Sequence, residues 1–230
     1  MLPVQHKHSL EPGDAKEQLQ ARRQFLQAGF FDPLKKRMQE LLPATAETVL
    51  DIGCGEGYFT AGFSNALPNA TVYGIDIAKA GVRLAAKSAK QNHKLVYCVA
   101  SSADLPIADE SIDVITRIYA PSKDSELSRV IKPDGRLFIV APGENHLIGL
   151  RSRIYKDVRP HLPPEVPEGF EVVDQQRIQA ELVVEDSLLC AALLDMTPFA
   201  WRLAPELRDA ILRSKLRDTL DFAMAIYSKR

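Results

Sequence analysis

Three glycines at alternate positions, Gly53, Gly55 and Gly57, follow a short apolar run that contains Asp51. A second apolar run further along the chain ends in another acid, Asp76. Glycines let the backbone turn tightly and approach a ligand closely. A carboxylate at the carboxyl end of a neighbouring strand can accept both hydroxyls of a ribose. The spacing therefore predicts a nucleoside-containing ligand, bound where two parallel strands end.

The spacing of the glycines separates two classes of ligand. A dinucleotide fingerprint of the form G-x-G-x-x-G places backbone amides against a pyrophosphate and needs a third glycine where this chain has Tyr58. The pattern here is G-x-G-x-G, which is typical of sites for S-adenosylmethionine (AdoMet). This ligand has no phosphate, and its ammonium group suits a carboxylate such as Asp51. We therefore expect an AdoMet site rather than an NAD(P) site or an empty relic of the fold.

Strands and helices alternate after the glycine turn, which predicts an α/β fold with a mostly parallel sheet. The first two strands end at Ile52 and Asp76, and a turn at residues 132–135 precedes the fifth. From the hydrophobic periodicity we expect further strands at 95–99, 112–118, 136–141, 170–184 and 219–228, and helices at 78–90, 124–130, 147–158, 185–195 and 205–214. In the 185–195 helix and at Trp201, apolar side chains such as Leu188 are expected to be core.

Residues 1–44 precede the first strand and have no strand pattern of their own. Asp14 is a candidate cap for a helix that Gly29 stops, and Asp32 is a candidate cap for a second helix. We expect these helices to form a lid over the carboxyl edge of the sheet. The chain is then divided into a helical lid segment, 1–44, and a methyltransferase domain, 45–230.

Composition places the chain among ordinary globular proteins. It has 230 residues, with 46% hydrophobic and 26% charged residues, enough for one sizeable core. No apolar stretch approaches the roughly 18 residues of a membrane span, so we expect no membrane partner. Cys54, Cys98 and Cys190 are isolated and lack the spacing of metal ligands. A reduced, cytoplasmic protein without a bound metal is expected.

Net charge argues weakly against a nucleic-acid ligand. The formal charge is −1, whereas binding to phosphates normally needs a concentrated basic surface. Local basic clusters occur at residues 22–23, 35–37, 79–94 and 151–159. Most such clusters are simply solvated helix faces. The charge therefore leaves an RNA partner open.

Several longer segments resemble one family along nearly the whole chain. They include Arg-Ile-Tyr-Ala-Pro at 117–121, Pro-Gly at 142–143 with His146, and Met-Thr-Pro-Phe-Ala-Trp at 196–201. In these segments and in the glycine turn the chain resembles the RlmA family of AdoMet-dependent 23S ribosomal RNA guanine-N1 methyltransferases. The resemblance implies a class I methyltransferase fold, Rossmann-like with a seven-stranded sheet, a guanine in a 23S rRNA hairpin loop as acceptor, and possible homodimers.

Two features depart from that family. Its members normally begin with a small zinc ribbon that helps to recognise RNA, but no cysteine precedes Cys54 in this sequence. The departure leaves open whether the chain is truncated or naturally short and whether RNA is still the substrate. The second departure is Phe31, which stands where relatives tend to carry a tyrosine near the cofactor.

The resemblance also assigns roles to residues. Tyr119, at the end of the fourth strand, is the first candidate to contact the guanine, by stacking or positioning because a phenol is a poor base at neutral pH. The cofactor is expected to contact Phe31, Asp51, Gly53, Cys54, Gly55, Glu56, Gly57, Asp76, Ile77, Ser101, Ser102 and His146. The sequence does not identify the group that accepts the N1 proton.

Two other functions remain open at this point. A small-molecule methyltransferase could keep the family core after losing its means of docking RNA, and the near-neutral charge favours it. A non-enzymatic AdoMet-binding protein is a third reading, which the intact cofactor residues oppose. The family segments outside the glycine turn favour the RNA methyltransferase.

Overall fold

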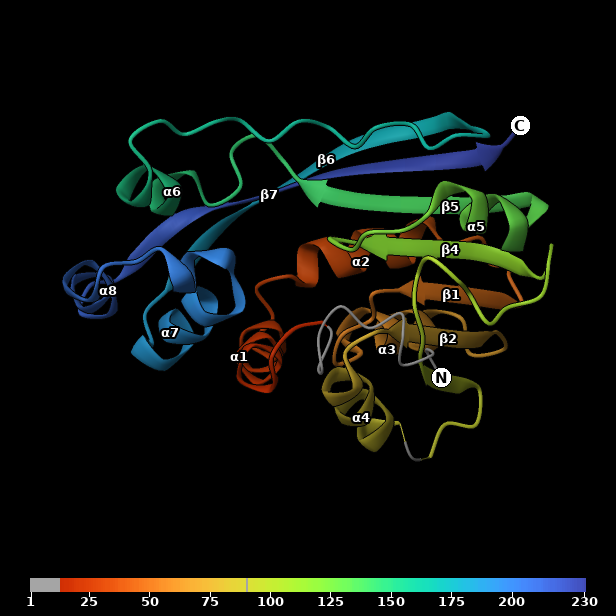
Figure 1. The fold of residues 1–230 in the computed structure, drawn as a ribbon, viewed down its shortest axis with the longest axis horizontal. Helices are drawn as coiled ribbons and strands as arrows, with labels where there is room; N and C mark the ends of the chain where they lie inside the picture. The colour runs from red at the N-terminus through yellow and green to blue at the C-terminus, as the bar shows by residue number, and fades with distance from the viewer. Residues whose placement is uncertain (1–12, 90) are drawn as a thin grey trace.

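The computed structural model describes residues 13–89 and 91–230, and one seven-stranded sheet organises them (Figure 1). The strand order is β3-β2-β1-β4-β5-β7-β6, in which the first five are parallel and β7 runs antiparallel to both of its neighbours. This confirms the mostly parallel α/β sheet expected from the sequence. The strands are β1 Thr48–Ile52, β2 Thr71–Asp76, β3 Leu95–Val99, β4 Ile112–Ile118, β5 Ile131–Pro142, β6 Phe170–Val184 and β7 Leu216–Lys229.

Helices connect the strands and also precede them. In Figure 1 the carboxyl ends of β1, β4 and β5 point to the left, toward the side where α1, α6, α7 and α8 lie. In the described part of the chain, no helix is both long and apolar enough to cross a membrane. The helices are α1 Lys16–Gln27, α2 Asp32–Leu41, α3 Tyr58–Ala66, α4 Lys79–Ser88, α5 Asp124–Val130, α6 Ile148–Ile154, α7 Ser187–Met196, the 3-10 turn η2 Pro198–Trp201 and α8 Pro205–Leu212.

The two proposed aspartate caps were wrong, because each carboxylate has another partner. Ala15, not Asp14, is the residue before α1, and the Asp14 carboxylate forms an ion pair with Arg22 at 2.6 Å. Asp32 lies inside α2 as its first residue, and Tyr58 donates a hydrogen bond to its carboxylate at 2.5 Å. Asp14 therefore pairs within its own helical segment, whereas Asp32 ties α2 to the start of α3.

Several element boundaries also differ from expectation, among them the start of the last strand, which is Leu216 rather than residue 219. The helix expected at 147–158 ends at Ile154, so the chain that leads to Pro160 is free to form a loop. The fifth strand begins at Ile131, because this residue pairs with Ile112 before the 132–135 turn bulges out of register.

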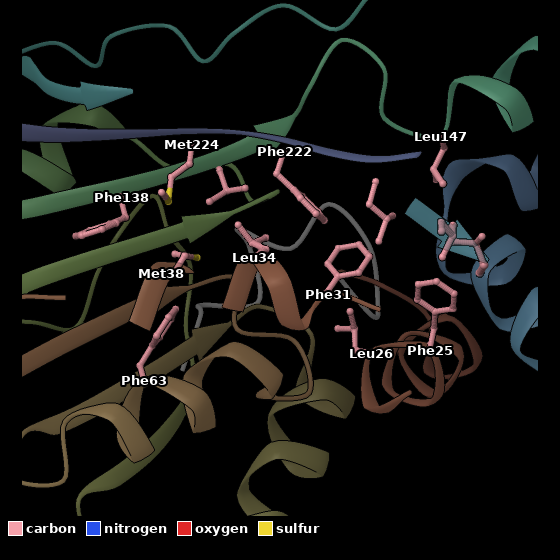
Figure 2. Close-up of a cluster of buried hydrophobic side chains, with 14 of the residues drawn as sticks. Phe25, Leu26, Phe31, Leu34, Met38, Phe63, Phe138, Leu147, Phe222 and Met224 are labelled. Carbon is pink, nitrogen blue, oxygen red and sulfur yellow. The ribbon is translucent and has the colours of Figure 1, made fainter. Parts of the chain in front are cut away.

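The N-terminal helices belong to the main hydrophobic core. Figure 2 shows Leu34 of α2 close to Phe222 of β7 and Met38 of α2 close to Met224, while Phe25 and Leu26 of α1 extend the same cluster away from these strands. Each of these side chains is buried. Burial of this size stabilises each helix by about 1.5–3 kcal/mol per large side chain. A lid function for residues 1–44 stays a prediction.

Two side chains that were expected in the core are exposed instead. Trp201 in η2 is 82% exposed and Leu188 in α7 is 66% exposed, while Leu193 of the same helix is buried. The hydrophobic run of α7 is longer than the face that its neighbours cover. The expectation of core positions for Trp201 and Leu188 was therefore wrong.

Candidate active site

A cavity of about 1380 Å³ opens at the carboxyl ends of the parallel strands. Ligand pockets usually occupy roughly 300–1,000 Å³, so this one has room for two reactants. One side is formed by α1 and the loops after β1, β2 and β3, which we call the cofactor side. The other side, called the acceptor side, is formed by the loops after β4 and β5, residues 155–161 and residues 196–199.

Nearly all the site residues expected from the sequence line this cavity. The lining residues among them are Phe31, Asp51, Gly53, Cys54, Gly55, Glu56, Asp76, Ile77, Ser101, Ser102, Tyr119 and His146. Gly57 does not line it. Its φ of +87° and the Tyr97 hydroxyl, which would lie 2.5 Å from an added Cβ, explain why this position needs glycine. Gly57 therefore allows the turn its shape but does not face the cavity.

Asp76 holds the glycine turn in place. One carboxylate oxygen accepts from the Gly55 amide at 2.9 Å, and the other accepts from the Ala78 amide at 2.7 Å. Each oxygen has a second lone pair, so both can still accept a ribose hydroxyl. Asp76 thus links the shape of the turn to a carboxylate that lines the cavity.

Two further carboxyl groups are buried on the cofactor side. Asp51 accepts hydrogen bonds from the hydroxyls of Thr60 at 2.6 Å and Thr116 at 2.7 Å. Burial raises the pKa of Asp51 to about 6 despite these bonds. Burial likewise raises the pKa of Glu56 to about 7. A cationic ligand beside these groups would favour their ionised forms.

Cofactor affinity is expected to increase with pH because of Glu56 and Asp51. A bound cation must compete with the protons that these carboxyls hold below pH 6 to 7, so AdoMet should bind roughly ten- to hundredfold more weakly at pH 5 than at pH 8. In the free protein, the free energy of unfolding depends on pH in the opposite direction from the affinity for AdoMet. The raised pKa of Glu56 contributes stability at low pH that is lost as pH rises from about 4.5 to 7.

Calorimetry and thermal melts at pH 5 and pH 8 measure both trends. Glu56→Gln should flatten the dependence of AdoMet affinity on pH near 7. An affinity that is the same at pH 5 and pH 8 in the unsubstituted protein would contradict an electrostatic role for either carboxyl.

Aromatic rings line the acceptor side next to the end of β4. Tyr119 has a φ of +55°, a left-handed conformation that is uncommon for a bulky residue. Its ring lies 6.5 Å from that of Phe222, nearly parallel, and 5.9 Å from that of His146, edge to face. Phe31 meets Phe222 at 4.9 Å, also edge to face. Strained residues that persist are concentrated at functional sites, and here the strain places a ring at the cavity.

Neither polar ring of this wall is a strong base. Burial lowers the pKa of His146 to about 4, so its imidazole is neutral at neutral pH. Its Nδ1 lies 2.9 Å from the backbone carbonyl oxygen of Asp221, which fixes the ring. Desolvation by the cavity walls raises the pKa of Tyr119, so the phenol stays protonated. The wall can hold and orient a flat molecule, in keeping with the expectation for Tyr119.

The two sides of the cavity carry opposite charges, which the sequence analysis missed. The acidic lining residues Asp14, Asp51, Glu56 and Asp76 all lie on the cofactor side, where Arg22 is the basic lining residue. The acceptor side has the basic lining residues Lys123, Arg151, Arg159 and His161, and Asp157 is its acid. The 151–159 cluster was visible in the sequence, but its direction relative to the cavity was not.

AdoMet fits the residues of the cofactor side. An added Cβ at Gly55 would meet only the end of the Arg22 side chain, at 3.7 Å, so the turn leaves open space where a ligand can lie against the backbone. Asp51 and Glu56 suit its cationic end, and Asp76 suits its ribose. When bound, AdoMet supplies a methyl group already activated by a sulfonium.

Sheet order and site together define a class I AdoMet-dependent methyltransferase, and residues 49–135 match the family model for a methyltransferase domain. The chain is 36% identical over 200 residues to the Bacillus subtilis protein "Putative 23S rRNA (guanine-N(1)-)-methyltransferase YxjB", covering 81% of this chain and 70% of the relative. The chain belongs to this family of 23S rRNA guanine-N1 methyltransferases, the RlmA family.

Two further comparisons agree with the family and with the fold. The 23S rRNA (guanine(748)-N(1))-methyltransferase of Streptomyces fradiae is 28% identical over 205 residues, covering 84% of this chain and 71% of the relative. The crystal structure of YcgJ from Bacillus subtilis superposes with a TM-score of 0.54 at 20% identity, covering 87% of this chain and 99% of YcgJ. At that identity the second likeness concerns the fold alone.

Proposed function

We propose that this methyltransferase transfers the methyl group of AdoMet to N1 of a guanine in a hairpin loop of 23S ribosomal RNA. The names of the relatives support this substrate. Both alignments span at least 200 residues, so they extend beyond the general domain at 49–135 into the segments that form the acceptor side. The extent of these alignments therefore supports the same acceptor of the methyl group in this chain and in these relatives.

The observation that carries the proposal is the aromatic wall beside the end of β4. Tyr119 and His146 present their rings to a cavity large enough for a second reactant, and the buried ring of Phe222 packs behind them. A flat base taken out of its stack binds well between such rings. The wall adjoins the glycine turn, because Gly53 lies against Ala120, the residue after Tyr119. A base held by the wall would thus lie next to the cofactor.

In the proposed mechanism, the chain's residues mainly position the reactants. Gly53, Cys54, Gly55 and Glu56 surround the methionine part of AdoMet, with Gly57 shaping the turn and Asp51 facing the ammonium. Asp76 binds the ribose, while Ile77, Ser101 and Ser102 contact the adenine, and Phe31 and His146 close the cavity. Alignment in a water-excluded site supplies most of the rate. N1 must also lose its proton, and neither Tyr119 nor His146 is a base strong enough to take it.

Trp201 offers the proposed RNA a further aromatic surface close to the cavity. Its ring is 82% exposed, whereas Phe199, two residues earlier in η2, is buried and lines the cavity. An exposed tryptophan offers a nucleobase a stacking surface worth about 1–3 kcal/mol. A nucleotide next to the target guanine is the proposed partner of this ring.

Primer extension tests the proposed substrate, because a methyl at N1 blocks base pairing and stops the polymerase. Large-subunit RNA from cells that lack the gene should show no stop at the target guanine, and complementation with this protein should restore it. Trp201→Ala should weaken hairpin binding about tenfold and leave AdoMet affinity unchanged. If purified protein binds AdoMet yet methylates no guanine in this RNA, the near-neutral charge of −1 favours the small-molecule alternative.

A further inference from the structure

Arg151 is a buried cation on the acceptor side of the cavity. It lies in α6, its side chain is 5% exposed, and it is one of the lining residues. Buried charges are normally paired with an opposite charge, as Asp221 is with Arg177 at 2.6 Å. Within residues 13–89 and 91–230, no carboxylate forms an ion pair with Arg151.

Backbone carbonyls satisfy only part of this guanidinium. Nη1 donates to the carbonyl oxygens of Glu144 at 3.1 Å and His146 at 3.3 Å, and Nη2 donates to the carbonyl of Arg159. A guanidinium has five N–H donors, so Nε–H and one Nη2–H have no acceptor among the residues that the structure describes. Carbonyls also leave the positive charge unbalanced. Arg151 lines the cavity, so an acceptor bound there can use these two donors.

Other basic groups surround Arg151 at the cavity. Arg159 and His161 line the same side. The 155–161 loop is joined to α6 because Arg151 donates a hydrogen bond to the Arg159 carbonyl. Burial, and after it the charge of Arg151, lower the pKa of His161, while the Asp221 carboxylate acts in the opposite direction. His161 is then a neutral hydrogen-bonding group. The acid of this side, Asp157, is exposed and makes no ion pair with Arg151.

We propose that Arg151, with His161, forms a binding site for the phosphate group of the nucleotide whose base enters the cavity. This inference rests on the proposed function, because it takes the acceptor to be a nucleotide. A phosphate supplies the missing negative charge and accepts two parallel N–H bonds from the free edge of a guanidinium. It would fix the sugar–phosphate backbone at one end of the cavity and leave the base against the aromatic wall. The role of Arg151 is binding, since the methyl transfer itself needs no cation there.

A double-mutant cycle on the RNA tests the assignment. The probe is the target hairpin with an uncharged methylphosphonate at the phosphate of the target nucleotide, compared with the same substitution at a phosphate four nucleotides away. Arg151→Gln should raise KM for the unmodified hairpin about ten- to hundredfold and leave AdoMet affinity unchanged. The methylphosphonate at the target site should raise the KM of the unsubstituted protein by a similar factor. It should have little effect on the KM of Arg151→Gln.

Matched variants separate binding from structure. Arg153→Gln removes a charge from the same helix at an exposed position outside the cavity and should change KM less than threefold. Arg151→Lys keeps the charge without the planar fork and should recover part of the affinity. If Arg151 serves only to anchor the 155–161 loop, Arg151→Gln will raise KM by the same factor for the unmodified hairpin and for the hairpin with the target-site methylphosphonate. That equal increase in KM would overturn the proposal.

A binding measurement without catalysis keeps this proposal distinct from the choice of substrate. Protein saturated with S-adenosylhomocysteine should bind guanosine 5′-monophosphate at least tenfold more tightly than guanosine, and Arg151→Gln should abolish the preference. If no RNA is methylated but this preference is found, the RNA assignment fails and the phosphate site stands. If RNA is methylated but neither KM nor nucleotide preference depends on Arg151, the RNA assignment stands and the phosphate site is overturned.

Discussion

Asp76→Ala is expected to weaken AdoMet binding by at least a hundredfold. The substitution removes the proposed ribose acceptor and also frees the amides of Gly55 and Ala78, which Asp76 binds at 2.9 and 2.7 Å. Hydrogen bonds to a charged group contribute about 1.5–3 kcal/mol each, so loss of the ribose bonds alone accounts for a large part of the effect. Isothermal titration calorimetry with AdoMet measures it. Asp76→Asn keeps one oxygen acceptor and should bind with intermediate affinity.

Asp113→Ala is the matched control for this substitution. Asp113 also accepts from two backbone amides, those of Glu47 at 3.0 Å and Thr48 at 2.9 Å, but it does not line the cavity. Asp113→Ala should therefore lower the melting temperature and leave AdoMet affinity unchanged. If both alanine variants reduce AdoMet affinity equally, the effect of Asp76 is general destabilisation, and its assignment to the ribose is wrong.

Tyr119→Ala is expected to lower kcat for RNA methylation ten- to hundredfold with little change in AdoMet affinity. The ring belongs to the proposed acceptor wall, so its loss affects the alignment of the base in the transition state rather than the binding of the cofactor. Base–aromatic stacking of about 1–3 kcal/mol sets this scale. Single-turnover methylation and calorimetry on the same preparation separate the two quantities. Tyr119→Phe should keep most of the rate if stacking dominates.

The φ of +55° at Tyr119 offers a second control. Glycine adopts this conformation without strain, so Tyr119→Gly should be more stable than Tyr119→Ala by about 1 kcal/mol. Both variants lack the ring and should be equally poor in methyl transfer. If Tyr119→Gly methylates RNA at the rate of the unsubstituted protein, the backbone and not the ring is the functional feature.

Local patterns predicted most of the sheet correctly. The strands at 95–99, 112–118 and 170–184 agree with the structure at both ends, because short apolar runs bounded by polar residues mark buried strands clearly. Helix starts were less predictable. Asp14 and Asp32 have the chemistry of caps, yet Arg22 of the following helix binds the first carboxylate and Tyr58 of α3 binds the second. A tertiary contact such as that between Tyr58 and Asp32 leaves no local signal.

The cofactor side was predictable, but the acceptor side was not. Glycine spacing and strand-end acids occupy short, ordered segments, so Asp51, Gly55 and Asp76 could be placed together from the sequence alone. Arg151 lines the cavity, and Phe222 supports the rings of Tyr119 and His146 that line it. The two residues are 71 positions apart in the chain, and nothing in their spacing indicates that they belong to one site. Exposure of Trp201 was missed because a tryptophan in an apolar segment is more often buried.

The two sides of the cavity stand on supports of unequal stiffness. The cofactor side rests on β1 and β2, which have paired strands on both edges. On the acceptor side, α6 and the loop after it are attached to the first part of β7, where residues 216–221 pair with β6 alone, since pairing with β5 begins only at Phe222. The amide of Leu147 is bound to this ribbon through the Thr219 carbonyl, and α6 with it.

A two-stranded ribbon is only marginally stable by itself, so its fluctuations cost less free energy than those of the central sheet. We therefore expect α6 and the loop after it to move more readily than the cofactor side when a substrate enters. One enzyme can in this way combine a rigid donor site with a compliant entrance.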